Sequence, residues 1–187
     1  HAHLDATVFQ SGYDHIGLLS SLANRAKDSN EVFVEHYRQK YAEPFMPPLW
    51  VVTELMTFGE LSRWFALTKD HKVKSAVARD LGLPSREVLA GTLQLLSYIR
   101  NICAHHGRLW NRQTVKRVPN IKRFSADLVI VETTSESGVQ AQPANFIYNA
   151  LVVLVQMLSH QSADTSFVKR TVELIKTRSA DQLQAMG

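Results

Sequence analysis

Apolar residues recur every three or four positions along most of the chain, which is the spacing of a helix with one buried face. Prolines or capping residues stand where several of these patterns begin, as at Pro47 and Pro48 or at Pro84 and Ser85. The predicted helices cover about residues 13–27, 31–41, 49–65, 72–81, 85 to at least 100 and on toward 108, 143 onward, and 162 or 164 to 178. Helix therefore dominates the expected fold.

The periodic pattern is interrupted between Gln113 and Gln142. A short apolar run there, Leu128–Val131, predicts a strand, and residues 133–138 have the composition of a loop. Pro143 then begins a buried helix, and Ser162 or Asp164 caps the last one. The predicted fold class is all-α, a helical bundle with one irregular, short-stranded excursion near residues 113–142.

Composition excludes several other classes of protein. The 187 residues suffice for one domain, or for one domain with a short appendage, and 45% hydrophobic with 20% charged residues is ordinary for a packed core. The most apolar stretch, residues 144–158, contains Asn145, Asn149 and Gln156 and is shorter than the roughly 20 residues of a membrane span. A net charge of +4 suits a polyanionic partner without requiring one.

The single cysteine, Cys103, excludes an internal disulfide framework and a cysteine-rich zinc site. It fits a reducing compartment, and its place on the apolar side of its helix predicts a small buried side chain. We expect neither a metal nor another cofactor. The sequence opens at His1 with no signal-like stretch, and we expect a fragment or a trimmed chain.

Polar groups concentrate in one predicted helix, in the sequence LLSYIRNICAHHGRLWNR from Leu95 to Arg112. At about 100° per residue, one narrow stripe of this helix would carry Asn101, His105, Arg108 and Arg112. Arg100 would flank that stripe, while His106 and Trp110 would lie on the opposite, apolar side. The two histidines therefore differ: the wheel predicts a functional role for His105 and a structural role in or beside the core for His106.

A histidine beside an asparagine and several arginines suits phosphoryl chemistry. Imidazole has an unperturbed pKa near 6.5, so it can accept or release a proton at neutral pH. The guanidinium of arginine presents a fixed fork of donors that matches phosphate oxygens. Such a set could remove the proton of a ribose 2′-hydroxyl and stabilise the charge on phosphorus without a metal. These residue types suggest this chemistry but are not specific for it.

The same residues resemble a known family. Arg100, four residues and His105 form the pattern of HEPN domains, and the string from Arg100 to Arg112 strongly resembles the Abi-like proteins of bacterial abortive infection, the AbiD/AbiF type. The resemblance covers residues Ala2–Arg117. Other pieces that agree in order are His3-Leu4-Asp5-Ala6, His36-Tyr37, Pro47-Pro48-Leu49-Trp50 with Glu54, and Phe58-Gly59-Glu60-Leu61-Ser62.

The resemblance implies a HEPN-like helical bundle over residues 1–117, whose N-terminal part is expected to be missing from this chain. Residues 118–187 would add the irregular segment and two C-terminal helices packed on that core. The implied function is a metal-independent endoribonuclease of phage defence or of toxin type, in the cytoplasm of a bacterium. Its implied partners are RNA, a second copy of the chain, and an antitoxin or a regulatory RNA, with no membrane.

The resemblance also implies residue roles. Arg100 would contact the scissile phosphate, His105 would act as general base or acid, and Asn101 would orient the ribose or the imidazole. Glu54 would lie on or near the buried side of its helix and could pair with Arg100 or orient His105; a purely structural ion pair is equally compatible. Arg108 and Arg112 would hold flanking phosphates of the RNA. Apart from the resemblance, the basic run that contains Lys116 and Arg117 could extend this RNA-binding track, and a solvated loop is equally compatible.

A second class of function stays open. The same basic stripe could belong to a non-catalytic, HEPN-like module that binds RNA or a protein partner. The intact set of Arg100, Asn101 and His105 favours the nuclease, because binding alone would not require all three together.

Overall fold

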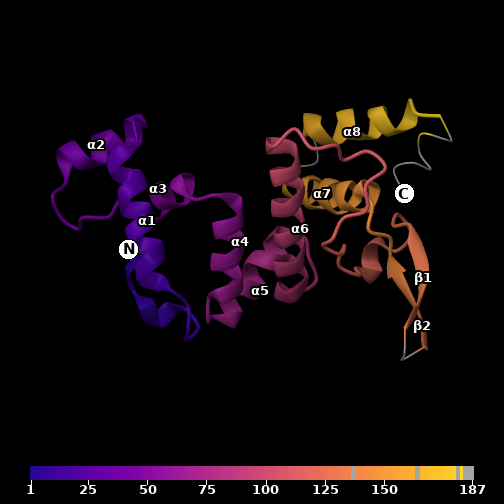
Figure 1. The fold of residues 1–187 in the computed structure, drawn as a ribbon, viewed down its shortest axis with the longest axis horizontal. Helices are drawn as coiled ribbons and strands as arrows, with labels where there is room; N and C mark the ends of the chain where they lie inside the picture. Colours follow the sequence, from indigo (N-terminus) through magenta and orange to yellow (C-terminus); the bar gives the residue numbers. More distant parts are fainter. Residues whose placement is uncertain (136–137, 163–164, 180–181, 183–187) are drawn as a thin grey trace. The chain divides into compact units, whose positions relative to one another are not determined.

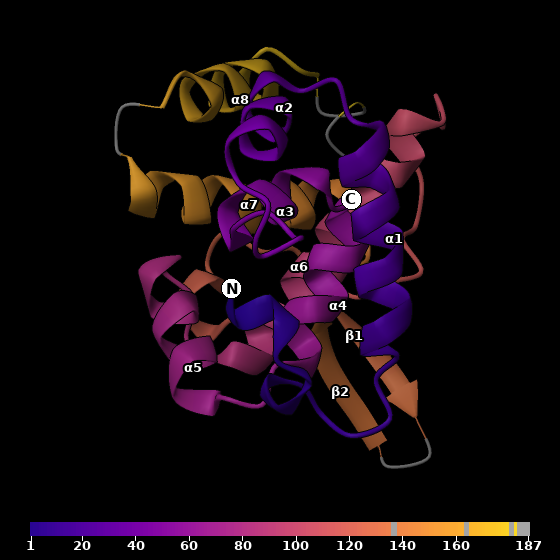
Figure 2. The same cartoon turned by 90° about the vertical axis from the view of Figure 1, so that its left-hand side faces the viewer.

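The computed structural model describes residues 1–135, 138–162, 165–179 and 182. Contacts within the chain divide it into two compact units, His1–His71 and Lys72–Gly187. Helices dominate both units, as Figure 1 and the turned view in Figure 2 show. The predicted all-α class with a short-stranded excursion is confirmed. The HEPN-like arrangement and the expected division at residue 117 stay predictions.

The first unit packs four α-helices around an aromatic centre. Two short 3-10 turns, η1 (Ala2–Leu4) and η2 (Ala6–Val8), precede α1 (His15–Asp28), α2 (Val32–Lys40), α3 (Leu49–Leu55) and α4 (Phe58–Leu67). The ring of Phe9 stacks on that of Trp64, with 5.5 Å between centroids and 14° between planes. Leu22, Met46 and Val52 complete this buried cluster, which ties the N-terminal segment to α1, α3 and α4.

The single long helix predicted from Leu49 to Phe65 is wrong, because the chain breaks between α3 and α4. The Thr57 hydroxyl accepts the N–H of Glu60 at 3.2 Å, and the Glu60 carboxylate accepts the N–H of Thr57 at 2.8 Å. This reciprocal capping box starts a new helix at Phe58. Its Thr-x-x-Glu signature is present in the sequence, but the continuous apolar pattern on both sides conceals it.

Buried histidine is an unusual feature of this unit. The His3 ring lies edge-on to Trp64, and Nε2 of His15 donates to the His3 carbonyl at 2.7 Å. The side chain of His3 is 1% exposed, and neither of its ring nitrogens has a hydrogen-bond partner among the described residues. Burial lowers the pKa of His3, and the positive charges of the N-terminus and of His15 lower it further.

The second unit is built around one long helix. Its elements are α5 (His71–Asp80), α6 (Arg86–Ala104), the 3-10 turn η3 (Lys122–Phe124), β1 (Ile130–Ser135), β2 (Gly138–Pro143), α7 (Ile147–Gln161) and α8 (Ser166–Lys176). Helix α7 packs across α6, and α8 lies beside α7 (Figures 1 and 2). Gly82 follows α5 with a left-handed φ of 73°, and Ser85 caps α6 by accepting the N–H of Val88 at 3.2 Å.

The irregular excursion contains a β-hairpin that is longer than predicted. Strands β1 and β2 pair antiparallel from Ile130↔Pro143 to Ser135↔Gly138, so the expected loop at 133–138 is wrong where it overlaps the strands. Pro143 ends β2 instead of beginning α7. The buried side chain of Asn149 fixes the hairpin to α7. Its Oδ1 accepts the N–H of Val129 at 2.8 Å, and its Nδ2 donates to the carbonyls of Val129 at 2.8 Å and Ala144 at 2.9 Å.

The last helix, α8, begins after Ser162, which is one of the two residues predicted to cap it. The N–H of Ser162 bonds back to the carbonyl of Leu158, so Ser162 ends α7 and does not start α8. Thr165 caps α8 instead, accepting the N–H of Phe167 at 3.3 Å, and the helix ends at Lys176. The alternative cap, Asp164, lies outside the described residues.

Candidate functional site

Helix α6 ends at Ala104, and a specific set of backbone hydrogen bonds closes it. The N–H of Gly107 bonds the carbonyl of Ile102 at 2.7 Å, and the N–H of His106 bonds that of Cys103 at 3.0 Å. These two bonds, with His106 at a φ of 54°, form a Schellman motif. The helix predicted to continue toward Arg108 is therefore wrong: the chain leaves the helix axis at His105, whose N–H still bonds Asn101 at 3.1 Å.

Gly107 has a steric reason to be glycine. A Cβ at this position would lie 2.7 Å from Cγ2 and 3.0 Å from the carbonyl oxygen of Ile102. Ile102 is buried, so it has little room to move away. The contact between Gly107 and Ile102 thus requires the absence of a side chain and determines where the helix stops.

His106 does not occupy the core position that the helical wheel predicts. Its side chain is exposed, and its backbone is in the left-handed region, where glycine is usual at this place of the motif. A side chain in that conformation costs about 1 kcal/mol. The wheel failed here because it assumes helical geometry through Gly107.

Arg100, Asn101 and His105 form the candidate catalytic group. All three side chains are exposed, and Nη1 of Arg100 donates to Oδ1 of Asn101 at 3.3 Å. The structure therefore pairs Asn101 with the arginine. The ring of His105 has no hydrogen-bond partner within the described part of the chain. The guanidinium of Arg100 and the imidazole of His105 thus both meet solvent at the end of α6.

Arg108 and Arg112 do not share a helical stripe with His105, because α6 ends before them. They lie with Lys116 on the irregular segment after Gly107, and all three are exposed. Thr114 anchors this segment: its N–H bonds the carbonyl of Asn145 at 2.7 Å. The segment is therefore a tethered loop that presents cations.

Arg117 is exposed at the end of the same cationic segment. Its guanidinium donates to Oε1 of Gln142 on β2, so the hairpin helps to position it. The buried side chains of Val118 and Ile121 follow directly and hold the segment to the unit. The residues predicted to bind RNA thus lie on one surface-exposed stretch of chain, although the helix expected to carry them is absent.

Two other predictions about this helix end are corrected. Cys103 is exposed and not buried, and Trp110 is 39% exposed where packing was expected. Ile102 alone of the last residues of α6 turns into the core. Because the helix stops one residue after Cys103, the apolar face that the wheel drew through Cys103, His106 and Trp110 does not form.

Glu54 is exposed on α3 and does not lie on the buried side of its helix. It belongs to the first unit, whereas Arg100 and His105 belong to the second. A carboxylate of the first unit that does engage an arginine is Glu60, which binds Arg25 through both oxygens at 2.6 and 2.7 Å. This pair could not be predicted, because residues far apart in sequence leave no spacing signal.

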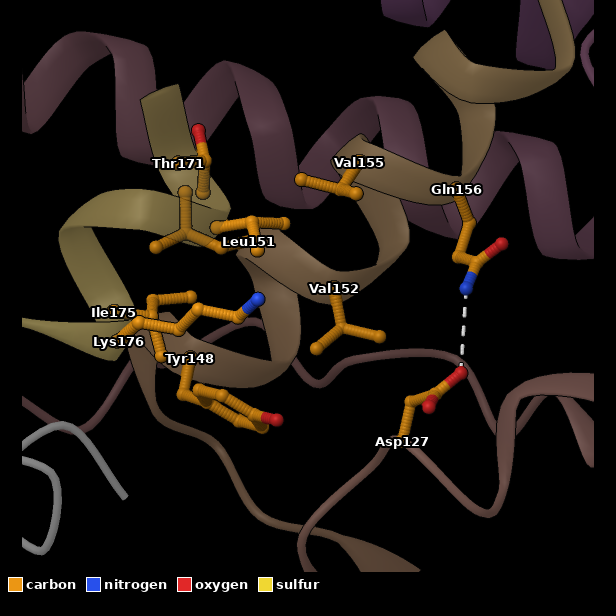
Figure 3. Close-up of a pocket in the computed structure, with 10 residues that line it drawn as sticks. Asp127, Tyr148, Leu151, Val152, Val155, Gln156, Thr171, Ile175 and Lys176 are labelled. Atoms are coloured by element: carbon orange, nitrogen blue, oxygen red, sulfur yellow. Dashed lines mark hydrogen bonds between the residues drawn. The ribbon is translucent and has the colours of Figure 1, made fainter. Parts of the chain in front are cut away.

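A cavity between α7 and α8 was also not predicted (Figure 3). It has a volume of about 280 Å³, and apolar side chains of both helices form most of its wall. Gln156 donates to Asp127 at its edge at 3.2 Å, and Lys176, Tyr148 and Thr171 supply further polar atoms. Leu151, Val152, Val155 and Ile175 make it a hydrophobic contact surface.

No three His, Cys, Asp or Glu side chains of the described ranges are grouped so that they could hold a metal ion. Likewise, none of the helices found in those ranges has the length and apolar character needed to cross a bilayer.

A match to a known protein family covers the chain from its first residue to just beyond the end of α6. The model of a family described as Abi-like protein matches residues 1–111, which is more than half of the chain. The match includes Arg100, Asn101, His105 and His106 and stops within the cationic segment. Neither the curated proteins nor the solved structures contain a significant match to this chain.

Proposed function

The chain belongs to the Abi-like protein family, whose role is abortive infection, a bacterial defence against phage, and we propose that it acts there as a metal-independent endoribonuclease. The observation that carries this proposal is the end of α6. There, the Arg100–Asn101 pair is exposed together with the ring of His105, which has no hydrogen-bond partner among the described residues. This set combines a proton acceptor with a fixed cation, the two requirements for attack by a ribose 2′-hydroxyl.

Each residue has one role in the proposed reaction. The imidazole of His105 accepts the proton of the 2′-hydroxyl, and the 2′-oxygen then attacks the adjacent phosphorus. The guanidinium of Arg100 donates to the non-bridging phosphate oxygens and balances the charge that builds there. Asn101 holds one edge of that guanidinium, and its free amide N–H groups can donate to the ribose.

The cationic segment supplies a track for the rest of the RNA. Ten residues of this segment carry four exposed cations: Arg108, Arg112, Lys116 and Arg117. Their positive charges could bind successive phosphates of an RNA strand that passes the end of α6. Contacts of this kind hold phosphates and carry little base specificity, so the track positions the strand while His105 and Arg100 act on one linkage.

A second copy of the chain would complete the site. The exposure of Arg100, Asn101 and His105 supports an arrangement in which two HEPN-like protomers face each other and exclude water from one cleft. Mixing the Arg100→Ala and His105→Ala variants should then restore part of the activity, because one composite cleft of the mixed dimer keeps both groups. A regulatory RNA or an antitoxin would hold such a nuclease inactive in the cytoplasm.

The test is cleavage of a mixed-sequence RNA in excess EDTA. We expect the parent chain to cleave and the His105→Ala variant to be inactive, while His71→Ala, which replaces another exposed histidine at the start of α5, cleaves like the parent. No cleavage by the parent would overturn the proposal. If such a chain still bound RNA and released it at higher salt, the non-catalytic binding module would be the better description.

A further inference from the structure

His106 stands where the Schellman motif at the end of α6 normally has glycine. We propose that His106 is the general acid of the reaction, which protonates the 5′-oxygen that leaves phosphorus. The proposal rests on the endoribonuclease function proposed above, and it adds a second catalytic histidine to the candidate site.

The structure gives no other reason for a histidine at this position. The side chain is exposed, so it does not contribute to the core, and its ring has no hydrogen-bond partner among the residues that the structure describes. Its φ of 54° is unfavourable for most residues with a side chain, and glycine would form the same two backbone bonds without strain. Strained residues of this kind occur preferentially at functional sites.

Cleavage by a 2′-hydroxyl needs two proton transfers on opposite sides of phosphorus. The 2′-oxygen loses a proton as its bond to phosphorus forms, and the 5′-oxygen gains one as its bond to phosphorus breaks. One imidazole cannot serve both oxygens in the same step, because attacking and leaving atoms are in line. His105 takes the first proton and His106 gives the second, which leaves a 2′,3′-cyclic phosphate and a 5′-hydroxyl; exchange with water then resets both rings.

The backbone at the helix end favours this division of roles. The φ angle changes from −98° at His105 to 54° at His106, so these neighbouring residues do not continue one helical face. The other polar groups of the last turn cannot replace His106. A guanidinium such as that of Arg100 does not release a proton at neutral pH, and the amide of Asn101 is not an acid.

Two variants test the proposal without disturbing the helix end. Asparagine and glycine both accept the left-handed conformation, so His106→Asn and His106→Gly should fold, and the melting temperature of His106→Gly should rise by about 1–3 °C. On ordinary RNA both variants should be slower than the parent by about 100-fold or more. On RNA with sulfur in place of the leaving 5′-oxygen, whose thiolate needs no proton to leave, they should stay within a few-fold of the parent.

Cleavage rates on the same two substrates distinguish the results that would overturn this role of His106. If His106→Asn cleaves ordinary RNA at the parental rate, His106 is not the acid, and His105 of a second copy becomes the candidate. If both substrates are lost equally, His106 is a structural residue. His105→Ala should lose both substrates, since the 2′-hydroxyl must be deprotonated in each. A parent chain that cleaves neither substrate overturns the nuclease function itself, an outcome distinct from the first two.

Discussion

The backbone N–H of Gly107 donates to the carbonyl oxygen of Ile102 at 2.7 Å, and this bond ends α6 beside the candidate site. The two neighbouring carbonyls, of Asn101 and Cys103, accept the N–H groups of His105 and His106. With these three acceptors satisfied inside the chain, the end of the helix presents fewer free carbonyls to an approaching phosphate.

Replacing Gly107 with alanine should disturb this helix end. The new Cβ would lie within 3.0 Å of two atoms of Ile102, so we expect the free energy of unfolding to fall by about 2 kcal/mol and RNA cleavage to fall with it. Gly91→Ala, inside α6, is the control, because the nearest atom to its new Cβ belongs to Pro119 and is 3.3 Å away. Urea unfolding measures both; equal stability of the two variants would show that the approach to Ile102 is not tight.

Arg100→Lys separates the charge of the arginine from its geometry. The ammonium keeps the positive charge but loses the planar fork and its hydrogen bond to Asn101, so cleavage should slow by about 10- to 100-fold. Since Arg100 is exposed, the unfolding free energy should change by less than about 0.5 kcal/mol. Arg79→Lys, at an exposed position of α5, is the control. Full activity of Arg100→Lys would mean that only charge matters at this position.

The cationic segment should govern affinity and not the chemical step. Arg112→Ala should weaken RNA binding at every sequence and lower the slope of log affinity against log salt by about 1, as expected for the loss of one phosphate contact. Fluorescence anisotropy at several salt concentrations measures this slope. An unchanged slope would place Arg112 outside the RNA track.

The start and the end of α6 show what could be predicted from the sequence. Its start is a local matter: Ser85 follows a proline, precedes an apolar pattern and caps the helix as expected. Its end depends on the approach of Gly107 to Ile102 and on a left-handed histidine. Neither feature can be predicted from the spacing of apolar residues, because a helical wheel assumes that every residue is helical.

The candidate site divides in the same way. Arg100 and Asn101 lie inside α6, so their shared exposure could be inferred from spacing. Arg108 and Arg112 lie beyond its end, on a path that depends on the hydrogen bond between Thr114 and Asn145, 31 residues apart. Contacts at such separations leave no pattern in a single sequence, and the same holds for the pair of Arg25 and Glu60.

Glu60 combines two stabilising contacts that substitutions can separate. Glu60→Gln keeps a side-chain acceptor for the capping box but loses the ion pair with Arg25, which should cost about 1 kcal/mol. Glu60→Ala loses both contacts and should cost about 1 kcal/mol more. Thermal unfolding followed by circular dichroism measures the difference; equal losses would mean that the capping box contributes nothing.

Acid should weaken the first unit in two steps with different causes. Burial lowers the pKa of His3, so below about pH 6.5 the unfolded chain takes up a proton that the folded chain refuses, and stability falls as pH drops. The hydrogen bond from Arg25 lowers the pKa of Glu60 to about 2, so its contribution is complete above about pH 4.5 and is lost as pH falls from there toward 2.

The matched test for the first step is His3→Phe, because the His3 ring makes no hydrogen bond in the described structure that phenylalanine would lose. Between pH 7 and pH 5 the melting temperature of the parent should fall more steeply than that of the variant. Parallel curves would show that His3 takes up its proton without a penalty.

In the proposed reaction, a 2′-hydroxyl of the RNA attacks phosphorus at the helix end that carries Arg100 and His105. Its most direct test is the chemistry of the fragment ends after cleavage by the parent chain in excess EDTA, determined by mass spectrometry. We predict 2′,3′-cyclic phosphates together with 5′-hydroxyls, and no such products with His105→Ala. Fragments that end in 3′-hydroxyls with 5′-phosphates, or cleavage that persists in the His105→Ala variant, would contradict the account.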